Sequence, residues 1–575
     1  MTIDSYFVLS VFIGTIIGLI KFQQRPALVF GISLLILFVS NMVSTEQVVS
    51  SFSNQGLLTL ILLLVCSLAL EKTRFLRMIA TKVIHKSYGK TFLHLFSFTV
   101  LSSALLNNTA VVSTMLAPIR NNPYHAGSKL LLPLSYAAIL GGTLTLVGTS
   151  TNLIVNSLVL GAGLPSLSFF DFTLVGSCLV ITCGLALWFL SRFLPDHHVN
   201  SEVIQTYFID AKVSEKSTLT GKTIEENGLR QLQSLFLVEI ARGQHLLSPV
   251  SPSEVLQAND RLIFSGDVTK VKQLEQFDGL SIFANHQGLL LDNLTEVVIR
   301  PESVLLGKSL KKAGFRALFD AAVVAIKRDG ENLSGKLGEV ALRSGDYLVL
   351  AVGEDFKSRR NISKNFIVVS GVELDSMLSG GKALLATLGF FVAILGSALG
   401  LFTLFKGLIV LLGLLLLTNS VTPGELLRRL PVELWLIISS ALVLSYSFNN
   451  SGLLEGFALL VDSYALTLSP FYALVIIYIL TWWLTELVTN NAAAALIFPI
   501  AYGLAVTLDA NPMAFIMAVA FGASGSFVSP YGYQTNLMVF NAGQYKLSDF
   551  VKIGLPISII YGVVAVTAIT LVFGL

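Results

Sequence analysis

The chain has 575 residues, of which 54% are hydrophobic and only 13% are charged, and its mean hydropathy is +0.75. Soluble domains contain roughly 25% charged residues, so this composition excludes an ordinary soluble globular protein and indicates a membrane protein. The net charge of +3 is too small to predict a nucleic-acid partner. The three cysteines lie in apolar runs without the spacing of metal ligands or of a disulfide framework.

Six apolar runs occupy the first transmembrane region, which we place at 1–195, and a spanning helix needs about 20 such residues. Lys and Arg, which mark cytoplasmic loops, follow the first, third, fourth and sixth runs and are missing from the loops after the second and fifth. The fourth run must therefore enter and leave on the cytoplasmic side, as a re-entrant hairpin with Asn107, Asn108 and Thr109 at its tip. The runs are 6–20, 26–43, 55–70, 92–118, 130–160 and 169–194.

The charged residues are concentrated in the middle of the chain. Residues 196–375 hold about 45 of the 73 Asp, Glu, Lys and Arg residues, which is close to the density of a soluble domain. We therefore expect residues 196–377 to form a cytoplasmic insertion between two membrane regions.

This insertion is itself a tandem repeat with an offset of 86 residues. Gly221-Lys222 matches Gly307-Lys308, Arg242 matches Arg328, and Asp260 matches Asp346. Alternating apolar and polar residues predict strands, so we assign two α/β domains at 205–290 and 291–372. They resemble the TrkA-C (RCK C-terminal) regulatory domains of potassium-uptake proteins and channels, which implies an unknown cytosolic ligand. NAD is not expected, because no strand followed by G-x-G-x-x-G is present.

Six more runs follow in the second transmembrane region, at 378–575. Arg428 and Arg429 mark the inside, no Lys or Arg occurs from 431 to 545, and Lys546 and Lys552 mark the inside again. The fourth run is therefore a hairpin entered from outside, with Thr489, Asn490 and Asn491 at its tip. The runs are 383–400, 402–417, 434–445, 471–508, 513–541 and 553–575.

These assignments predict a polytopic all-α membrane protein with an inverted-topology repeat, which is typical of secondary transporters. Each half has five transmembrane helices and one re-entrant hairpin, and both termini lie outside. Residues 141–155 also align without a gap on 525–539, which pairs Gly148 with Gly532 and Asn152 with Asn536. Because these polar stretches interrupt long helical runs, we predict an unwound break within the membrane at each.

Two hairpin tips and two breaks of Asn, Thr, Ser and Gly offer oxygen ligands for Na⁺ and helix N-termini for an anion. Small polar residues also allow close helix packing, and for one isolated Asn or Gly that explanation is preferable. The paired set, repeated in both halves, favours a binding site.

The tips and the breaks GGTLTLVGTSTN and SPYGYQTN resemble the divalent anion/sodium symporter family over essentially the whole membrane region. The resemblance implies Na⁺ as coupling ion, a small dianion as substrate and a homodimer. Sulfate is favoured over a di- or tricarboxylate such as succinate, because the second break lacks the double proline of the carboxylate carriers. By resemblance, substrate is bound by Asn107, Asn108, Thr109, Thr489, Asn490 and Asn491, and sodium by Asn108, Gly148, Thr149, Ser150, Thr151 and Asn152 in one site and Asn490, Ser529, Thr535 and Asn536 in the other.

Glu486 is the one acid deep in an apolar run. An intramembrane carboxylate suggests a proton or cation site, and the alternative is a carboxyl group that is hydrogen-bonded, or packed against Trp482 and Trp483. The basic run 72–90 is expected to touch anionic lipids of the inner or plasma membrane. No arrangement of Ser, His and Asp predicts an enzyme. A potassium channel would need a TVGYG-like filter, which the sequence lacks, and an anion sensor with a transporter fold stays open.

Overall fold

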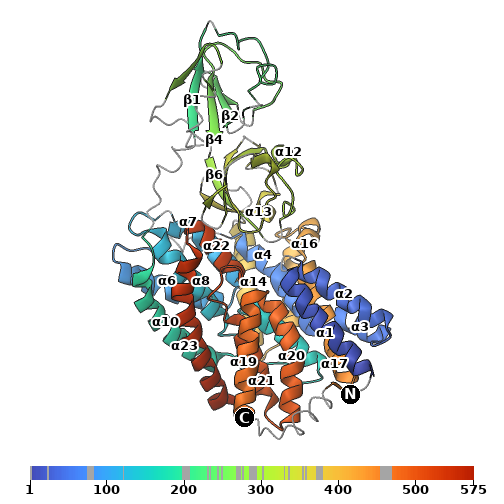
Figure 1. The fold of residues 1–575 in the computed structure, drawn as a ribbon. Coiled ribbons are helices and arrows are strands. Elements are labelled where there is room, and N and C mark those ends of the chain that lie inside the picture. The colour runs from blue at the N-terminus through green and yellow to red at the C-terminus, as the bar shows by residue number, and fades with distance from the viewer. Residues whose placement is uncertain are drawn as a thin grey trace.

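In this computed structural model, a bundle of helices carries two β-sheet modules at one end (Figure 1). The structure describes residues 3–22, 25–73, 83–120, 122–196, 378, 380–453 and 469–575, together with most of 208–283 and 294–370. Helix α1 begins and helix α23 ends at the end of the bundle that is farthest from the modules (Figure 1). The modules and the two ends of the described chain therefore lie on opposite sides of the bundle.

The helices of the first half follow the apolar runs. The runs 92–118 and 130–160 are each split in two, at 104–107 and at 143–149. Ser44 and Asn54 cap α3 and α4 through their side-chain oxygens. The bounds are α1 Ile3–Lys21, α2 Pro26–Val39, α3 Thr45–Phe52, α4 Gln55–Glu71, α6 Tyr88–Ser103, α7 Asn108–Arg120, α8 Gly127–Gly142, α9 Ser150–Gly161 and α10 Thr173–Leu190, followed by η1 Ser191–Phe193.

The second half repeats this order. The runs 471–508 and 513–541 are split at 488–489 and 525–533. Thr489 caps α20 by accepting a hydrogen bond from the backbone N–H of Ala492 at 3.4 Å. The bounds are α14 Gly380–Ala398, α15 Leu404–Leu417, α16 Pro423–Arg429, α17 Val432–Asn450, α19 Pro470–Leu487, α20 Asn490–Thr507, α21 Pro512–Ser524, α22 Gln534–Ala542 and α23 Leu547–Phe573.

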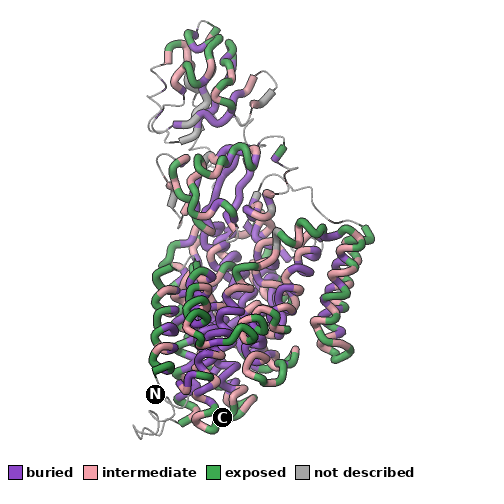
Figure 2. The backbone as a smooth tube through the Cα atoms, turned by 90° about the vertical axis from the view of Figure 1, so that its right-hand side faces the viewer, coloured by how far each residue is buried: buried purple, intermediate pink, exposed green. Residues whose placement is uncertain are grey.

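The hairpins and split helices form the centre of a multi-helix membrane protein. Within the described ranges, eight helical segments are long and apolar enough to cross a membrane. Buried residues make up 33% of the most apolar stretch of α1 and 28% of that of α14, but 67% of that of α20. Figure 2 shows buried residues gathered in the interior and exposed ones along the outer helices. The outer helices present Leu, Ile, Val and Phe side chains outward, as a surface in contact with lipid requires.

The two halves interlock through their split helices. Helix α9 of the first half packs against α20 and α21 of the second, and α22 of the second packs against α7 and α8 of the first. Each split helix therefore lies beside the hairpin helix of the other half.

Between the halves, the chain forms two five-stranded antiparallel sheets. Their orders are β3-β2-β4-β1-β5 and β10-β6-β9-β7-β8, and a shift of 86 residues maps each strand of the first sheet onto its counterpart in the second. Short helices α12 Phe315–Phe319 and α13 Ile362–Asn365 and the 3₁₀ turn η4 Leu337–Glu339 accompany the second sheet. The strands are β1 Phe208–Val213, β2 Leu235–Arg242, β3 His245–Leu247, β4 Arg261–Gly266, β5 Leu280–Phe283, β6 Leu294–Ile299, β7 Ala321–Arg328, β8 Glu331–Asn332, β9 Tyr347–Val352 and β10 Phe366–Ser370.

The same ion pair recurs in both modules. Arg328 binds both carboxylate oxygens of buried Asp346 at 2.7 Å, and Arg242 binds both oxygens of Asp260 at 2.9 Å. The β-bulges of β2 and β7 also fall at equivalent positions. The two modules are therefore copies of one fold.

We expect Arg328→Met to destabilise the second module, because the substitution leaves the Asp346 carboxylate buried without its partner. The expected loss is about 3 kcal/mol in the free energy of unfolding. Limited proteolysis of the full-length protein over a urea series measures it, with exposed Lys308→Met as the control. An unchanged urea midpoint of cleavage within 294–370 would show that the pair contributes little.

Candidate substrate and ion site

Four helix N-termini meet at the centre of the bundle. They belong to α7, α9, α20 and α22, which begin at Asn108, Ser150, Asn490 and Gln534. Each follows a hairpin tip or a break. A helix N-terminus carries a partial positive charge and unpaired backbone N–H groups, so this convergence is suited to an anion.

The first hairpin tip is built around the amide of Asn108. The Asn108 amide is oriented so that both its nitrogen and its oxygen have hydrogen-bond partners. The nitrogen donates to Ser103 Oγ at 2.5 Å and to the carbonyl oxygen of Gly148 at 3.0 Å. The amide oxygen accepts from the hydroxyl of Tyr533 at 2.6 Å. Asn107 caps α7, since its side-chain oxygen accepts from the backbone N–H of Thr109 at 2.9 Å. The amide of Asn108 therefore joins its own hairpin, the first break and the second break.

The second tip repeats part of this arrangement. Thr485 Oγ1 lies 2.8 Å from the amide oxygen of Asn490 and 2.8 Å from the carbonyl oxygen of Ala523, as Ser103 Oγ lies 2.5 Å from Asn108 and 2.9 Å from the carbonyl oxygen of Ala138. The amide nitrogen of Asn490 is buried, and no described protein group accepts from it. This nitrogen is a donor that a bound ligand can use.

Contacts between the halves surround the two tips. Ser150 Oγ and Thr151 Oγ1 donate to the amide oxygen of Asn491 at 3.2 and 3.4 Å. Thr109 Oγ1 donates to Gln534 Oε1 at 3.2 Å. Each hairpin tip thus contacts the N-terminus of the split helix of the other half.

At the centre of the site, Thr149 and Tyr533 occupy equivalent positions of the two breaks. Their hydroxyl oxygens lie 3.2 Å apart. The phenol of Tyr533 therefore bridges the first break and the amide of Asn108.

Further side chains hold the breaks themselves. Asn152 donates to the carbonyl oxygen of Thr145 at 2.8 Å, and Asn536 donates to that of Ser526 at 2.9 Å. A Cβ at Gly148 would lie 2.6 Å from the carbonyl oxygen of Gly142, so glycine is required where the first break folds back on itself. Asn152, Asn536 and Gly148 therefore fix the backbone conformation of the two breaks.

Glu486 binds the backbone of the second break. Its carboxylate accepts hydrogen bonds from the backbone N–H groups of Phe527 and Val528, both at 3.0 Å, and of Ser529 at 2.8 Å. The carboxylate therefore holds a loop whose amides would otherwise lack partners inside the membrane. These contacts match the hydrogen-bonded alternative considered for this residue.

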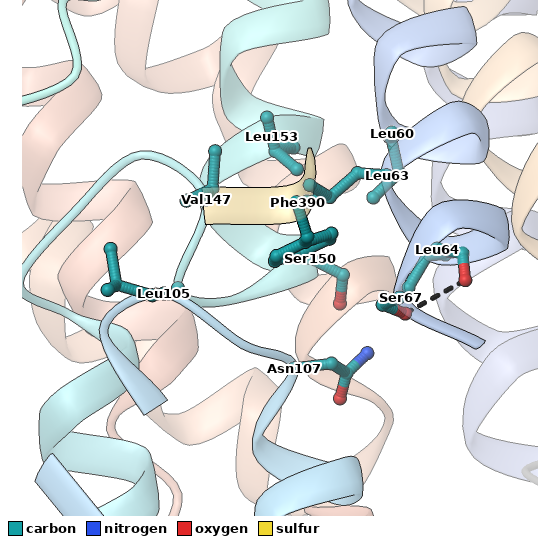
Figure 3. A pocket seen from close by; sticks show the side chains of 11 residues that line it. Leu60, Leu63, Leu64, Ser67, Leu105, Asn107, Val147, Ser150, Leu153 and Phe390 are labelled. Atoms are coloured by element: carbon teal, nitrogen blue, oxygen red, sulfur yellow. Dashed lines mark hydrogen bonds between the residues drawn. The ribbon is translucent and has the colours of Figure 1, made fainter. Parts of the chain in front are cut away.

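A small pocket lies beside the first tip (Figure 3). Asn107, Gly148 and Ser150 line it on one side, and leucines of α4 and Phe390 of α14 on the other. In Figure 3 the side chain of Ser150 lies next to the ring of Phe390, and that of Asn107 lies below both. The pocket is thus mostly apolar, with the polar side chains of Ser67, Asn107 and Ser150 in its lining.

Ser150 and Thr151, which the resemblance assigns to the first site, donate to Asn491 of the second tip, and Ser150 also lines the pocket beside Asn107 of the first tip. The backbone N–H of Ser529 donates to Glu486. The hydroxyl oxygen of Ser135 in α8 lies 2.9 Å from Thr535 Oγ1 and 2.7 Å from the amide oxygen of Asn536.

Sequence reasoning did not select Ser103, Thr485, Tyr533 or Gln534. The first two were detectable as a hydroxyl residue five positions before each tip asparagine. Tyr533 and Gln534 lie in the predicted break SPYGYQTN, but their individual roles depend on contacts with the other half, which the sequence does not report.

Comparisons with known proteins identify the family of the chain. The family model described as citrate transporter matches residues 15–520. An uncharacterized transporter of Synechocystis is 30% identical, over 94% of this chain and 92% of that protein. A putative sulfur deprivation response regulator of Chlamydomonas reinhardtii is 28% identical over 94% and 96%, and sodium/sulfate cotransporter 1 of that organism is 29% identical over 64% and 44%. The chain therefore belongs to the citrate transporter family of membrane transporters and is not an enzyme.

Proposed function

We propose that the protein is a sodium-coupled symporter of a small divalent anion, sulfate before di- or tricarboxylates, that works by alternating access. The observation that carries this proposal is the convergence of the N-termini of α7, α9, α20 and α22 at two amide-bearing tips. Relatives named sodium/sulfate cotransporters support both the ion and the anion.

Electrostatics explains why transport would be coupled to sodium. Each helix N-terminus contributes roughly half a positive charge, and no Lys or Arg is found among the described residues of the tips and breaks. The carbonyl ends of neighbouring helices carry partial negative charges that offset this, so a dianion would bind weakly alone and more tightly with cations beside it. The carbonyl ends of α6, α8, α19 and α21 lie next to the tips, where oxygen ligands such as those of Gly148 and Asn490 can bind Na⁺.

The proposal includes the inverted repeat of five spans and one hairpin per half. It is supported by an equivalent hydrogen bond within each half, since the contact of Ser103 with Asn108 is matched by that of Thr485 with Asn490. We further propose that residues 196–377 are cytoplasmic, that the two β modules at 205–290 and 291–372 are TrkA-C domains, that the termini are outside, and that the protein is a homodimer in the inner or plasma membrane.

A second candidate is an anion sensor that has kept the transporter fold. The relative named a putative sulfur deprivation response regulator, which is similar over 94% of this chain, favours it. A sensor would bind the anion without moving it across the membrane.

Reconstitution into liposomes distinguishes these functions. We expect uptake of radiolabelled sulfate when Na⁺ is higher outside, about tenfold or more above that with K⁺ in its place, and weaker uptake of succinate and citrate. Empty liposomes provide the control. Sulfate binding without uptake would favour the sensor. Uptake of a carboxylate that sulfate does not inhibit would show that the carboxylate, and not sulfate, is the substrate.

A further inference from the structure

The second β module lies directly on the helical bundle (Figure 1). Both faces of its sheet are buried: Val297, Leu348 and Leu350 pack into the module's own core, whereas Tyr347 and Ile367 belong to the apolar core that continues into the bundle. Among the described residues of the first module, only Val238 joins that continuous core. Contact with the bundle is therefore a property of the second copy.

The contact contains a buried cluster of charged and polar side chains. Arg120, the last residue of α7, is 5% exposed and donates to Glu296 Oε2 at 2.5 Å and to the hydroxyl of Tyr347. Its guanidinium also lies 4.9 Å from the centre of the Tyr347 ring, as in a cation–π contact. Burial, together with the positive charge of Arg120, lowers the pKa of nearby Lys327. This cluster fixes the end of α7 to strands β6 and β9.

The same module also holds the end of α22. Asn541, one residue before the end of that helix, donates from its amide to the carbonyl oxygen of Gly345. Gly345 has φ +81°, and a Cβ there would lie 2.7 Å from Leu537 Cγ of α22. The turn before β9 is therefore shaped to the side of this helix.

Helices α7 and α22 come from opposite halves, and their other ends form the site. Arg120 lies about 18 Å along α7 from Asn108, at 1.5 Å per residue. At that distant end, Asn108 contacts Tyr533, and Thr109 contacts Gln534. The two helices are thus joined to each other at the site and to one module at their cytoplasmic ends.

We propose that the second module is a brace that keeps α7 and α22 in register, and that Arg120, Glu296 and Asn541 are positioning residues for the transport site. This inference rests on the proposed function. A buried ion pair adds little net stability, but losing one partner leaves an uncompensated charge. Breaking this contact would therefore be costly, so we expect it to persist in every state of the transport cycle. The module then moves together with α7 and α22.

The test is a comparison of Arg120→Met and Asn541→Ala with wild type in the full-length protein. We expect the KM for the anion and for Na⁺ to rise about tenfold in Arg120→Met and less in Asn541→Ala, with Vmax changed by less than about twofold. The effects should be non-additive in the double variant, because both residues hold the same brace. Arg242→Met, the same change at an ion pair of the first module, is the matched control.

Hydrogen exchange provides a readout that does not need transport. In Arg120→Met, we expect amides of 104–109 and 530–537 to exchange about tenfold faster, with α1 and α2 unchanged. An unchanged KM, or faster exchange confined to the module and the end of α7, would overturn the brace. Absence of uptake by the wild type would instead overturn the proposed function, and the exchange experiment would still test the brace.

Discussion

Replacing Asn108 or Asn490 by alanine is expected to reduce sodium-dependent anion uptake by about 100-fold or more. The amide of Asn108 connects Ser103, Gly148 and Tyr533, and that of Asn490 keeps a buried donor for a ligand. Losing two such hydrogen bonds costs roughly 3 kcal/mol, which corresponds to about a hundredfold in binding. Uptake of radiolabelled sulfate into liposomes, normalised to folded protein by size-exclusion chromatography, measures the loss.

Matched controls are available on the same two helices. Ser113 of α7 and Thr507 of α20 hydrogen-bond only to backbone carbonyls of their own helix in the contacts observed, so Ser113→Ala and Thr507→Ala should transport like wild type. If either asparagine variant takes up sulfate at the wild-type rate, the tip that carries this asparagine is not part of the transport site. An equal loss in the control on the same helix would point to folding instead.

The positions of the helices and their interruptions follow closely from local sequence. Apolar runs predict helices, and polar residues such as Asn107 and Thr489 cap the start of the next helix, because these effects act within a few residues along the chain. The 86-residue repeat predicts strands in both copies within the insertion, and each copy forms its own five-stranded sheet with the same strand order. Alternation of apolar and polar residues is also a local signal.

The partition of the site between the halves could not be predicted in the same way. Ser150 and Thr151 follow the first break in sequence but contact Asn491, because α9 packs against α20. The sequence predicts that Arg120 lies in a cytoplasmic loop, because Lys and Arg mark such loops. In the structure it is buried beneath the second module. Such contacts depend on how distant segments pack, which periodicity and charge do not report.

Glu486→Gln is expected to reduce anion uptake by about 100-fold without changing its dependence on pH or on Na⁺. The carboxylate accepts three backbone hydrogen bonds from Phe527, Val528 and Ser529. A glutamine offers one acceptor oxygen and turns an N–H₂ group toward the remaining donors, so at least one buried amide loses its partner. Hydrogen bonds to a charged group contribute about 1.5–3 kcal/mol each, which is enough for a loss of this size.

Two measurements separate this structural role from a role in coupling. If Glu486 holds the break, hydrogen exchange of 525–533 accelerates in Glu486→Gln, and residual uptake keeps the wild-type pH profile and sodium dependence. If Glu486 carries the coupling proton, exchange stays slow and uptake loses its response to a pH gradient. Glu425→Gln, which alters the partly buried pair with Lys72 at the C-terminal end of α4, is the control for removing an acid elsewhere. We expect the first pattern, because the contacts of the carboxylate with the break account for its position without a transported proton.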